Sequence, residues 1–273
     1  MPKMKVGLVG CGNIATDLCI AVKEGDIPAE IAAVTDIARG KAVVLLRTFD
    51  MDAAICSLDE NAAAVDYLIE CAAADAVKEV VEAAIKHGTD CLIVSVGGLV
   101  EDPELFVRAR EADIALTIPS GAICGLDGIR AAQEAGLRSV TLTTRKPPKG
   151  LAGAPYLVEH SIDVDGLTEP RVVFEGTAAE AIKAFPKNVN VAATISLAGI
   201  GPDETRVQII ADPAATVNSH EIVVDGAFGR LRTVTENVPS PRNAKSSYLA
   251  SLSACAELRD AATAFAARRT PGW

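Results

Sequence analysis

A glycine-rich turn close to the N-terminus places the strongest constraint on how this chain folds. Residues 5–15 read KVGLVGCGNIA, an apolar run of strand length that leads into the spacing G-x-G-x-x-A of Gly10, Gly12 and Ala15. Gly10 allows a tight turn, Gly12 lets a pyrophosphate approach the backbone, and Ala15 lets the next helix pack against the strand. The N–H groups of that helix would face the phosphates, so the turn predicts a dinucleotide site.

A second apolar segment, residues 31–34, supports this interpretation. It ends at Asp36, where a dinucleotide-binding fold places an acid on the ribose hydroxyls. The residues of this region that we expect to bind the cofactor are Gly10, Gly12, Asn13, Ile14 and Asp36. Arg39 could pair with a 2′-phosphate, so NAD and NADP both remain open. An ordinary strand-to-helix turn with a solvated aspartate is the alternative.

Strand and helix patterns alternate over residues 1–119. This alternation predicts an α/β fold, an N-terminal Rossmann domain whose doubly wound parallel sheet is covered by helices on both faces. A second, smaller α/β domain with a mostly antiparallel sheet is expected over residues 120–245. Its expected helices and strands are residues 120–133, 139–144, 172–175, 177–185, 190–200, 206–211, 217–224 and 229–234. The last segment, 246–273, is expected to form a C-terminal helix that could return to the first domain.

Composition argues against several classes of function. A net charge of −10 disfavours nucleic acid and anionic membranes as partners. The apolar runs are shorter than the roughly 18–20 residues of a membrane helix, and the first strand begins too early for a signal peptide. Seven scattered cysteines and three histidines lack metal-ligand spacing. We therefore expect a cytoplasmic protein with reduced thiols and no metal site.

Two loops follow strands at the edge where ligands bind in such sheets. Cys71 and Ala72 begin one loop, and residues 95–98 form the other. Their small side chains would let a nicotinamide ribose approach. A tight strand-to-helix connection explains them equally well.

Histidine is the side chain best matched to proton transfer near neutral pH. His87 precedes Gly88 at the end of an expected helix, where capping explains it. His220 lies in an alternating segment and shares its inward face with Ile222 and Val224. From spacing alone, a hydrogen-bonded core histidine is the default interpretation.

Other polar residues interrupt apolar surroundings. Asn188 and Asn190 precede an expected buried helix, and either could be its N-cap. Lys245 and Ser246 follow a Pro-Ser-Pro turn at the expected start of the last helix. A lysine there could hold a carboxylate or could simply be a solvated residue of the first turn.

Several longer segments resemble the L-aspartate dehydrogenases. They run in order along nearly the whole chain and read GLVGCGNIA, VSVGGL, IPSGAICGLDGI, TRKPP, FEGTAAEAIKAFPKNVNVAATISLAGIG, NSHEI, GAFG and ENVPSPRNAKSSYLASLS. The resemblance implies a Rossmann domain, a smaller α/β domain that also forms a homodimer, and NAD(P)-dependent oxidative deamination of L-aspartate. The product would be iminoaspartate, which feeds NAD biosynthesis or hydrolyses to oxaloacetate and ammonia.

The same resemblance implies roles for particular residues. The active-site histidine of the N-x-H-E/Q motif falls on His220, which replaces the core-histidine default. The residues that contact the nicotinamide cofactor fall on Ala122 and Asn190. Residues 244–246 read Ala-Lys-Ser where relatives often have Pro-Lys-Thr, so the lysine is kept but the local turn could differ.

Aspartate carries two carboxylates, so an acidic protein must supply local cations to bind it. Lys245 is our first candidate, Arg145 and Lys146 are weaker ones, and Asn188 and Ser246 are further substrate-binding candidates. His220 would accept a proton from the substrate ammonium or activate the water that attacks the imine. A dehydrogenase of another small amino or hydroxy acid and a non-catalytic dinucleotide-sensing dimer are the alternatives.

Overall fold

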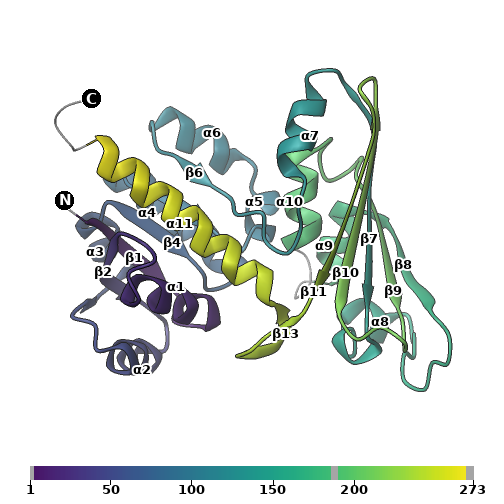
Figure 1. The fold of residues 1–273 in the computed structure, drawn as a ribbon, viewed down its shortest axis with the longest axis horizontal. Helices are drawn as coiled ribbons and strands as arrows, with labels where there is room; N and C mark the ends of the chain where they lie inside the picture. The colour runs from purple at the N-terminus through teal and green to yellow at the C-terminus, as the bar shows by residue number, and fades with distance from the viewer. Residues whose placement is uncertain (1–2, 186–189, 269–273) are drawn as a thin grey trace. The chain divides into compact units, whose positions relative to one another are not determined.

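The chain is described by a computed structural model that covers residues 3–185 and 190–268 (Figure 1). Its backbone divides into two compact units, Met1–Pro119 with Ser251–Trp273, and Ser120–Ala250. Within these described ranges, no helix has the length and apolar character needed to cross a bilayer. The same residues contain no group of three or more His, Cys, Asp or Glu side chains that could hold a metal ion.

A six-stranded sheet with the order β3-β2-β1-β4-β5-β6 forms the centre of the first unit. Its strands, all paired in parallel, are β1 (Met4–Val9), β2 (Ala29–Thr35), β3 (Ala54–Ile55), β4 (Tyr67–Glu70), β5 (Asp90–Ile93) and β6 (Leu116–Thr117). The strand order reverses between β1 and β4, and ligands of such sheets bind outside the carboxyl ends of the strands at this point. The predicted Rossmann fold is therefore confirmed.

Helices flank this sheet, and the C-terminal helix shares its core (Figure 1). They are α1 (Asn13–Lys23), α2 (Arg39–Phe49), α3 (Leu58–Ala64), η1 (Ala74–Ala76), α4 (Val77–His87), α5 (Gly97–Glu101), α6 (Glu104–Glu111) and α11 (Tyr248–Arg268). Ala254, Leu258 and Ala262 of α11 are buried in the same apolar cluster as Leu8 and Leu18. The end of the chain thus completes the core of the first unit.

Helix α3 is an element that the sequence patterns do not predict. It begins with a capping box, in which Ser57 Oγ accepts from the Glu60 N–H at 3.3 Å and the Glu60 carboxylate accepts from the Ser57 N–H at 2.9 Å. The buried Asn61 donates from Nδ2 to the Leu8 carbonyl at 3.1 Å. This hydrogen bond connects α3 to β1, two residues before Gly10 of the glycine turn.

The second unit is built on a five-stranded sheet with the order β11-β10-β7-β9-β8. Its strands are β7 (Leu137–Lys146), β8 (Arg171–Thr177), β9 (Arg206–Ala211), β10 (Asn218–Gly226) and β11 (Gly229–Asn237). Only the β7–β9 pair among these described strands is parallel, so the prediction of a mostly antiparallel sheet is confirmed. Alternate residues on one face of β7 and β10 are buried against the helices of this unit.

The helices of the second unit are α7 (Leu126–Gln133), η2 (Pro148–Gly150), α8 (Pro155–Glu159), α9 (Ala178–Ala184) and α10 (Asn190–Ala198). Helix α7 begins six residues later than the expected residue 120, since Gly121 and Gly125 adopt left-handed φ angles of +66° and +85°. The carbonyl of Ala122 accepts from the Asn237 side chain at 2.9 Å instead of from a helical N–H.

The expectation that Lys245 and Ser246 start the last helix is wrong. Both lie on β13 (Asn243–Ser247), which pairs in antiparallel fashion with β12 (Pro239–Ser240). The Tyr248 N–H donates to the Val238 carbonyl at 3.0 Å. This main-chain pairing holds the segment extended, so α11 begins only at Tyr248.

Candidate active site

The glycine turn between β1 and α1 has the backbone geometry that a bound phosphate needs. Gly10 has a φ of +94°, and a Cβ there would lie 2.6 Å from Cα of Ala72. Gly12 is the N-cap of α1, and apart from Gly12 and its chain neighbours no described residue has a heavy atom within 4 Å of where its Cβ would be. Asn13 and Ile14 are the first residues of α1. An anion can therefore reach the N–H groups at the start of this helix.

Two main-chain hydrogen bonds hold the side chain of Asp36 beside this turn. Its Oδ2 accepts from the Cys11 N–H at 2.8 Å, and its Oδ1 accepts from the Ala38 N–H at 2.7 Å. Arg39, the candidate partner of a 2′-phosphate, donates to the Ile55 carbonyl at 3.3 Å. The carboxylate thus lies next to the glycine turn, where the ribose of a dinucleotide is expected.

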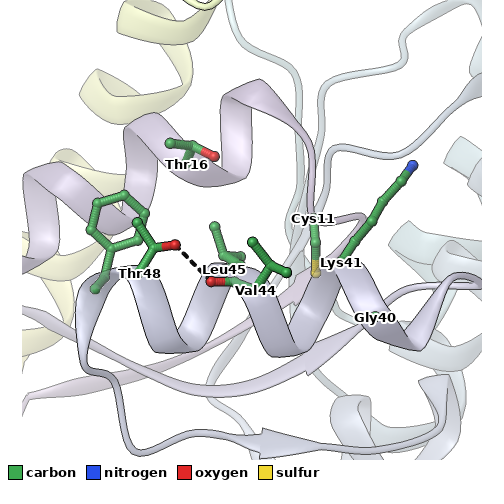
Figure 2. Close-up of a pocket in the computed structure, with 8 residues that line it drawn as sticks. Cys11, Thr16, Gly40, Lys41, Val44, Leu45 and Thr48 are labelled. Atoms are coloured by element: carbon green, nitrogen blue, oxygen red, sulfur yellow. Dashed lines mark hydrogen bonds between the residues drawn. The ribbon is translucent and has the colours of Figure 1, made fainter.

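A hollow of about 300 Å³ opens between α1 and α2 (Figure 2). Its lining residues are Cys11, Thr16, Gly40, Lys41, Val44, Leu45, Thr48 and Phe49. Burial and the nearby Asp36 charge raise the pKa of the Cys11 thiol to about 11, so this thiol stays neutral. The hollow thus combines an apolar wall with one cation, Lys41, whose charge acts on the Cys11 thiol.

Glu70 joins the two loops that follow β4 and β5. Its side chain is completely buried, and its Oε1 accepts from the Ala72 N–H at 2.7 Å and from Ser95 Oγ at 2.9 Å. Its Oε2 accepts from the Ser95 N–H at 2.8 Å. Cys71 Sγ contacts the Gly10 carbonyl at 3.3 Å. The structure thus brings Cys71 and Ala72 against the glycine turn, and the residues of the first unit fit a dinucleotide.

Sequence reasoning missed Glu70, although its signal is visible. An acidic residue ends the apolar segment YLIE, whose four residues are all buried in β4. A buried carboxylate needs hydrogen-bond donors, so such a residue marks a polar junction inside the fold. Burial raises the pKa of Glu70, while its N–H and hydroxyl donors act in the opposite direction.

His220 lies on β10 with its side chain on the inward face, as its alternation predicts. It is 4% exposed and lies opposite Thr144 of β7, whose Oγ1 is 3.0 Å from His220 Nδ1. Burial, and secondarily the charge of Lys146, lower the pKa of His220 to about 3. The ring is therefore neutral at physiological pH, and Nε2 is the nitrogen left for a ligand.

The two weaker cation candidates on β7 point to opposite faces of the sheet. Lys146 is 7% exposed, on the same face as Thr144, and burial lowers its pKa to about 8. Arg145 forms an ion pair with Asp212 at 2.7 Å, which lowers the pKa of that carboxyl. Lys146 is therefore the one that shares the His220 face.

The loop that carries Ala122 is fastened to the strand next to His220. The Ala122 carbonyl accepts from Thr235 Oγ1 at 3.0 Å and from Asn237 Nδ2 at 2.9 Å. Thr235 lies opposite His220 in the β10–β11 pair. The structure therefore brings Ala122 and His220 to the same part of the second unit.

The remaining candidates lie on α10 and β13 or outside the described residues. Asn190 is the exposed first residue of α10, and Asn188 lies outside the described residues. Ser246 is exposed and its Oγ accepts from Asn243 Nδ2 at 2.9 Å. Lys245 has a described backbone on β13, whereas its side chain is outside the described part of the chain. Their roles stay predictions.

Comparison with known proteins connects the two units to one family. The family model "Aspartate dehydrogenase, C-terminal" matches residues 127–261, and "Homoserine dehydrogenase, NAD binding domain" matches residues 10–117. An L-aspartate dehydrogenase of Methanosarcina acetivorans is 48% identical over 260 residues, which cover 94% of this chain and 96% of that protein. The chain belongs to the L-aspartate dehydrogenase family.

More distant members of the L-aspartate dehydrogenase family also align along nearly the whole chain. The enzyme of that name from Bradyrhizobium diazoefficiens is 40% identical over 258 residues, or 94% of this chain and 91% of that protein. The crystal structure of aspartate dehydrogenase from Thermotoga maritima has a TM-score of 0.72 at 29% identity and covers 95% of this chain and 97% of that chain. The predicted family and its NAD-binding domain are thus confirmed.

Proposed function

We propose that this chain catalyses the NAD(P)-dependent oxidative deamination of L-aspartate. Iminoaspartate is the immediate product, which either supplies NAD biosynthesis or hydrolyses to oxaloacetate and ammonia, and the reaction is reversible. Membership of the L-aspartate dehydrogenase family over nearly the full length supports this proposal. The open glycine turn and the fixed Asp36 support the use of a dinucleotide.

The observation that carries the proposal is the neutral, oriented ring of His220. A histidine buried in this way could be a purely structural core residue, but its Nε2 remains available after Thr144 takes Nδ1. His220 also lies near the buried Lys146 and near the Ala122 loop, which hydrogen bonds fasten to β11. These residues form a polar cluster inside an otherwise apolar unit. A cluster of buried polar residues is more typical of a site for a small polar substrate than of a hydrophobic core.

The chemistry follows from these side chains. A dinucleotide held at the glycine turn and Asp36 would supply the nicotinamide that serves as the acceptor for the hydride of the substrate Cα. A neutral His220 can accept a hydrogen bond from the substrate ammonium or from the water that attacks the imine, and so orients the reacting nitrogen or water. Lys245 remains our first candidate for a substrate carboxylate.

Absorbance of the reduced nicotinamide tests the proposal directly. The purified chain should reduce NAD or NADP with L-aspartate, and it should be far less active with L-glutamate and L-alanine. His220→Ala should lower kcat by roughly 10²-fold or more, since a lost positioning group costs about that much, while NADH binding followed by fluorescence changes little. Equal activity with all three amino acids, or near wild-type turnover of the variant, would refute the assignment.

We further propose that the first unit binds the dinucleotide, the second unit binds the substrate, and the enzyme is a cytoplasmic homodimer. Val234 on edge strand β11 and Val238 just after it are 51% and 58% exposed, which supports contact with a second copy. Light scattering should give twice the chain mass of 28.3 kDa. A single-chain mass at working concentration would contradict the dimer.

A further inference from the structure

The buried amine of Lys146 lies at the polar end of an otherwise apolar sheet face. Strands β7 and β10 are antiparallel and pair His220 with Thr144. Along this face each strand changes from apolar to polar toward the same end, through the buried residues Val140, Leu142, Thr144 and Lys146 of β7 and Val224, Ile222 and His220 of β10. Three polar side chains therefore gather where the apolar core stops.

The reaction proposed above requires a base. The substrate amine is an ammonium near neutral pH, and its nitrogen must lose a proton before its lone pair can form the C=N bond. His220 is poorly suited to this task because its buried ring resists protonation, and the positive charge of Lys146 adds to that resistance. The neighbouring amine of Lys146 is a second buried group that can exchange a proton.

We propose that Lys146 is a catalytic residue that accepts the proton of the substrate ammonium, with His220 remaining neutral beside it. This inference rests on the proposed function, and it assigns the proton transfer to a different residue from the one that the family motif singles out. Its basis is the shared, buried face of the two strands and the common polar end. Burial lowers the pKa of Lys146 to about 8. Its amine can therefore gain and lose a proton at a pH close to neutral.

The proton transfer balances as follows. One N–H bond of the substrate ammonium breaks, and one N–H bond forms on the neutral Nζ of Lys146, which becomes an ammonium. The freed lone pair of the substrate nitrogen forms the C=N bond. The Cα–H bond breaks at the same time, and its two electrons leave with the hydride, for which a bound nicotinamide would be the acceptor. Lys146 then returns its proton to water before the next turnover.

The charged groups around Lys146 are consistent with this role. From β10, His220 faces it. Arg145 on its own strand alternates to the other face and pairs with Asp212, which follows β9. Helix α10, which packs on β7, has the sequence NVAATISLA and contributes no titratable side chain over its described length. Burial is therefore the cause of the lowered pKa of Lys146.

The test is the pH profile of kcat/KM for L-aspartate in wild type, Lys146→Arg and Lys146→Met. In wild type, kcat/KM should rise with pH up to about 8 and then level off, because the neutral amine is the active form. Arginine keeps the charge but stays protonated, so Lys146→Arg should lower kcat about 10²–10⁴-fold and lose the limb near pH 8. Lys149→Met, at an exposed lysine of η2, is the matched control and should keep the wild-type profile.

Circular dichroism checks that the variants fold. The Kd for NADH from fluorescence titration should differ from the wild-type value by less than about twofold. If Lys146→Arg keeps kcat and the limb near pH 8, the inference is wrong. If Lys146→Arg stays active while Lys146→Met mainly raises KM for L-aspartate, the lysine binds a substrate carboxylate, and the inference is also wrong. A wild-type enzyme inactive with L-aspartate would instead refute the proposed function itself.

Discussion

Thr144 Oγ1 lies 3.0 Å from Nδ1 of His220, across the antiparallel pair of β7 and β10. Both side chains are buried, so this contact is protected from competing water. The hydroxyl fixes the plane of the ring and determines which ring nitrogen remains for a ligand. The orientation of the proposed active-site histidine thus depends on a residue from a different strand.

Replacing Thr144 by Val should therefore lower both catalysis and stability. The variant keeps the shape of the side chain but leaves a buried ring nitrogen without this partner, which costs about 1–3 kcal/mol. We expect kcat to fall roughly tenfold and Thr144→Ser to restore it. Thr143→Val, on the adjacent residue whose side chain alternates to the other face, is the control. Equal effects of the two valine variants in steady-state assays would contradict this role.

The lowered pKa of His220 predicts a loss of stability in acid. In the unfolded chain the ring has its ordinary pKa of 6.5, whereas in the fold it is about 3. Between these values the unfolded state binds the extra proton, so the free energy of unfolding decreases as pH falls, by up to about 1.4 kcal/mol per pH unit. His220→Asn should remove this contribution.

Urea unfolding at pH 7 and pH 5 measures this effect. The wild-type free energy of unfolding should drop between the two values by more than that of His220→Asn. His160→Asn, at an exposed ring outside the sheet, controls for the loss of a histidine in general. A drop of the same size in wild type and His220→Asn would show that the ring is not buried in a neutral state.

The parts of the site that depend on local pattern could be predicted from the sequence. The glycine turn and Asp36 follow from spacing along one strand, turn and helix. The inward position of His220 follows from simple alternation on β10. In each case the geometry is decided by residues close in sequence, and the strand period or turn chemistry determines it.

The parts decided by pairing between distant segments could not be predicted. The β12–β13 ribbon places Lys245 on a strand, although its sequence is compatible with a helix start. The late start of α7 depends on the hydrogen bond from Asn237 to the Ala122 carbonyl, which only the folded sheet provides. The bond between Glu70 and Ser95 likewise needs two neighbouring parallel strands. Sequence spacing carries no information about such partners.

Glu70→Gln should weaken cofactor binding. The amide has only one acceptor oxygen, so its NH₂ group would face one of the N–H donors from Ala72 and Ser95. Both loops next to the glycine turn would loosen. We expect a loss of about 1–3 kcal/mol in stability and a roughly tenfold weaker NADH affinity by fluorescence titration. Glu79→Gln, at an exposed position of α4, should change neither, and unchanged NADH affinity of Glu70→Gln would refute the role.

Asp36→Ser should shift the cofactor preference toward NADP. Two backbone N–H groups hold the carboxylate in place, and a fixed negative charge repels a 2′-phosphate. Arg39 and Lys41 in the first turn of α2 would remain as cations nearby. We expect the ratio of kcat/KM for NADP to kcat/KM for NAD to rise about tenfold. This change corresponds to the removal of a charge repulsion of about 1.4 kcal/mol. Asp52→Ser, at an exposed aspartate, is the control, and an unchanged ratio in Asp36→Ser would place the ribose elsewhere.

A comparison of Gly10→Ala with Gly25→Ala separates the cost of backbone strain from the cost of a steric clash. Both glycines have left-handed φ angles, +94° and +85°. A Cβ at Gly10 would lie 2.6 Å from Cα of Ala72. A Cβ at Gly25 would have no described atom within 4 Å other than those of Gly25 and its chain neighbours. Gly25→Ala should therefore cost about 1 kcal/mol from strain alone.

Gly10→Ala adds a collision with the backbone of the loop after β4, so it should destabilise the chain further and abolish NADH binding. Urea unfolding and fluorescence titration of the two variants give the comparison. If both variants lose the same stability and both still bind NADH, the glycine turn and the loop at Ala72 do not form one rigid site. If only Gly10→Ala loses binding, the contact between them is what shapes the dinucleotide site.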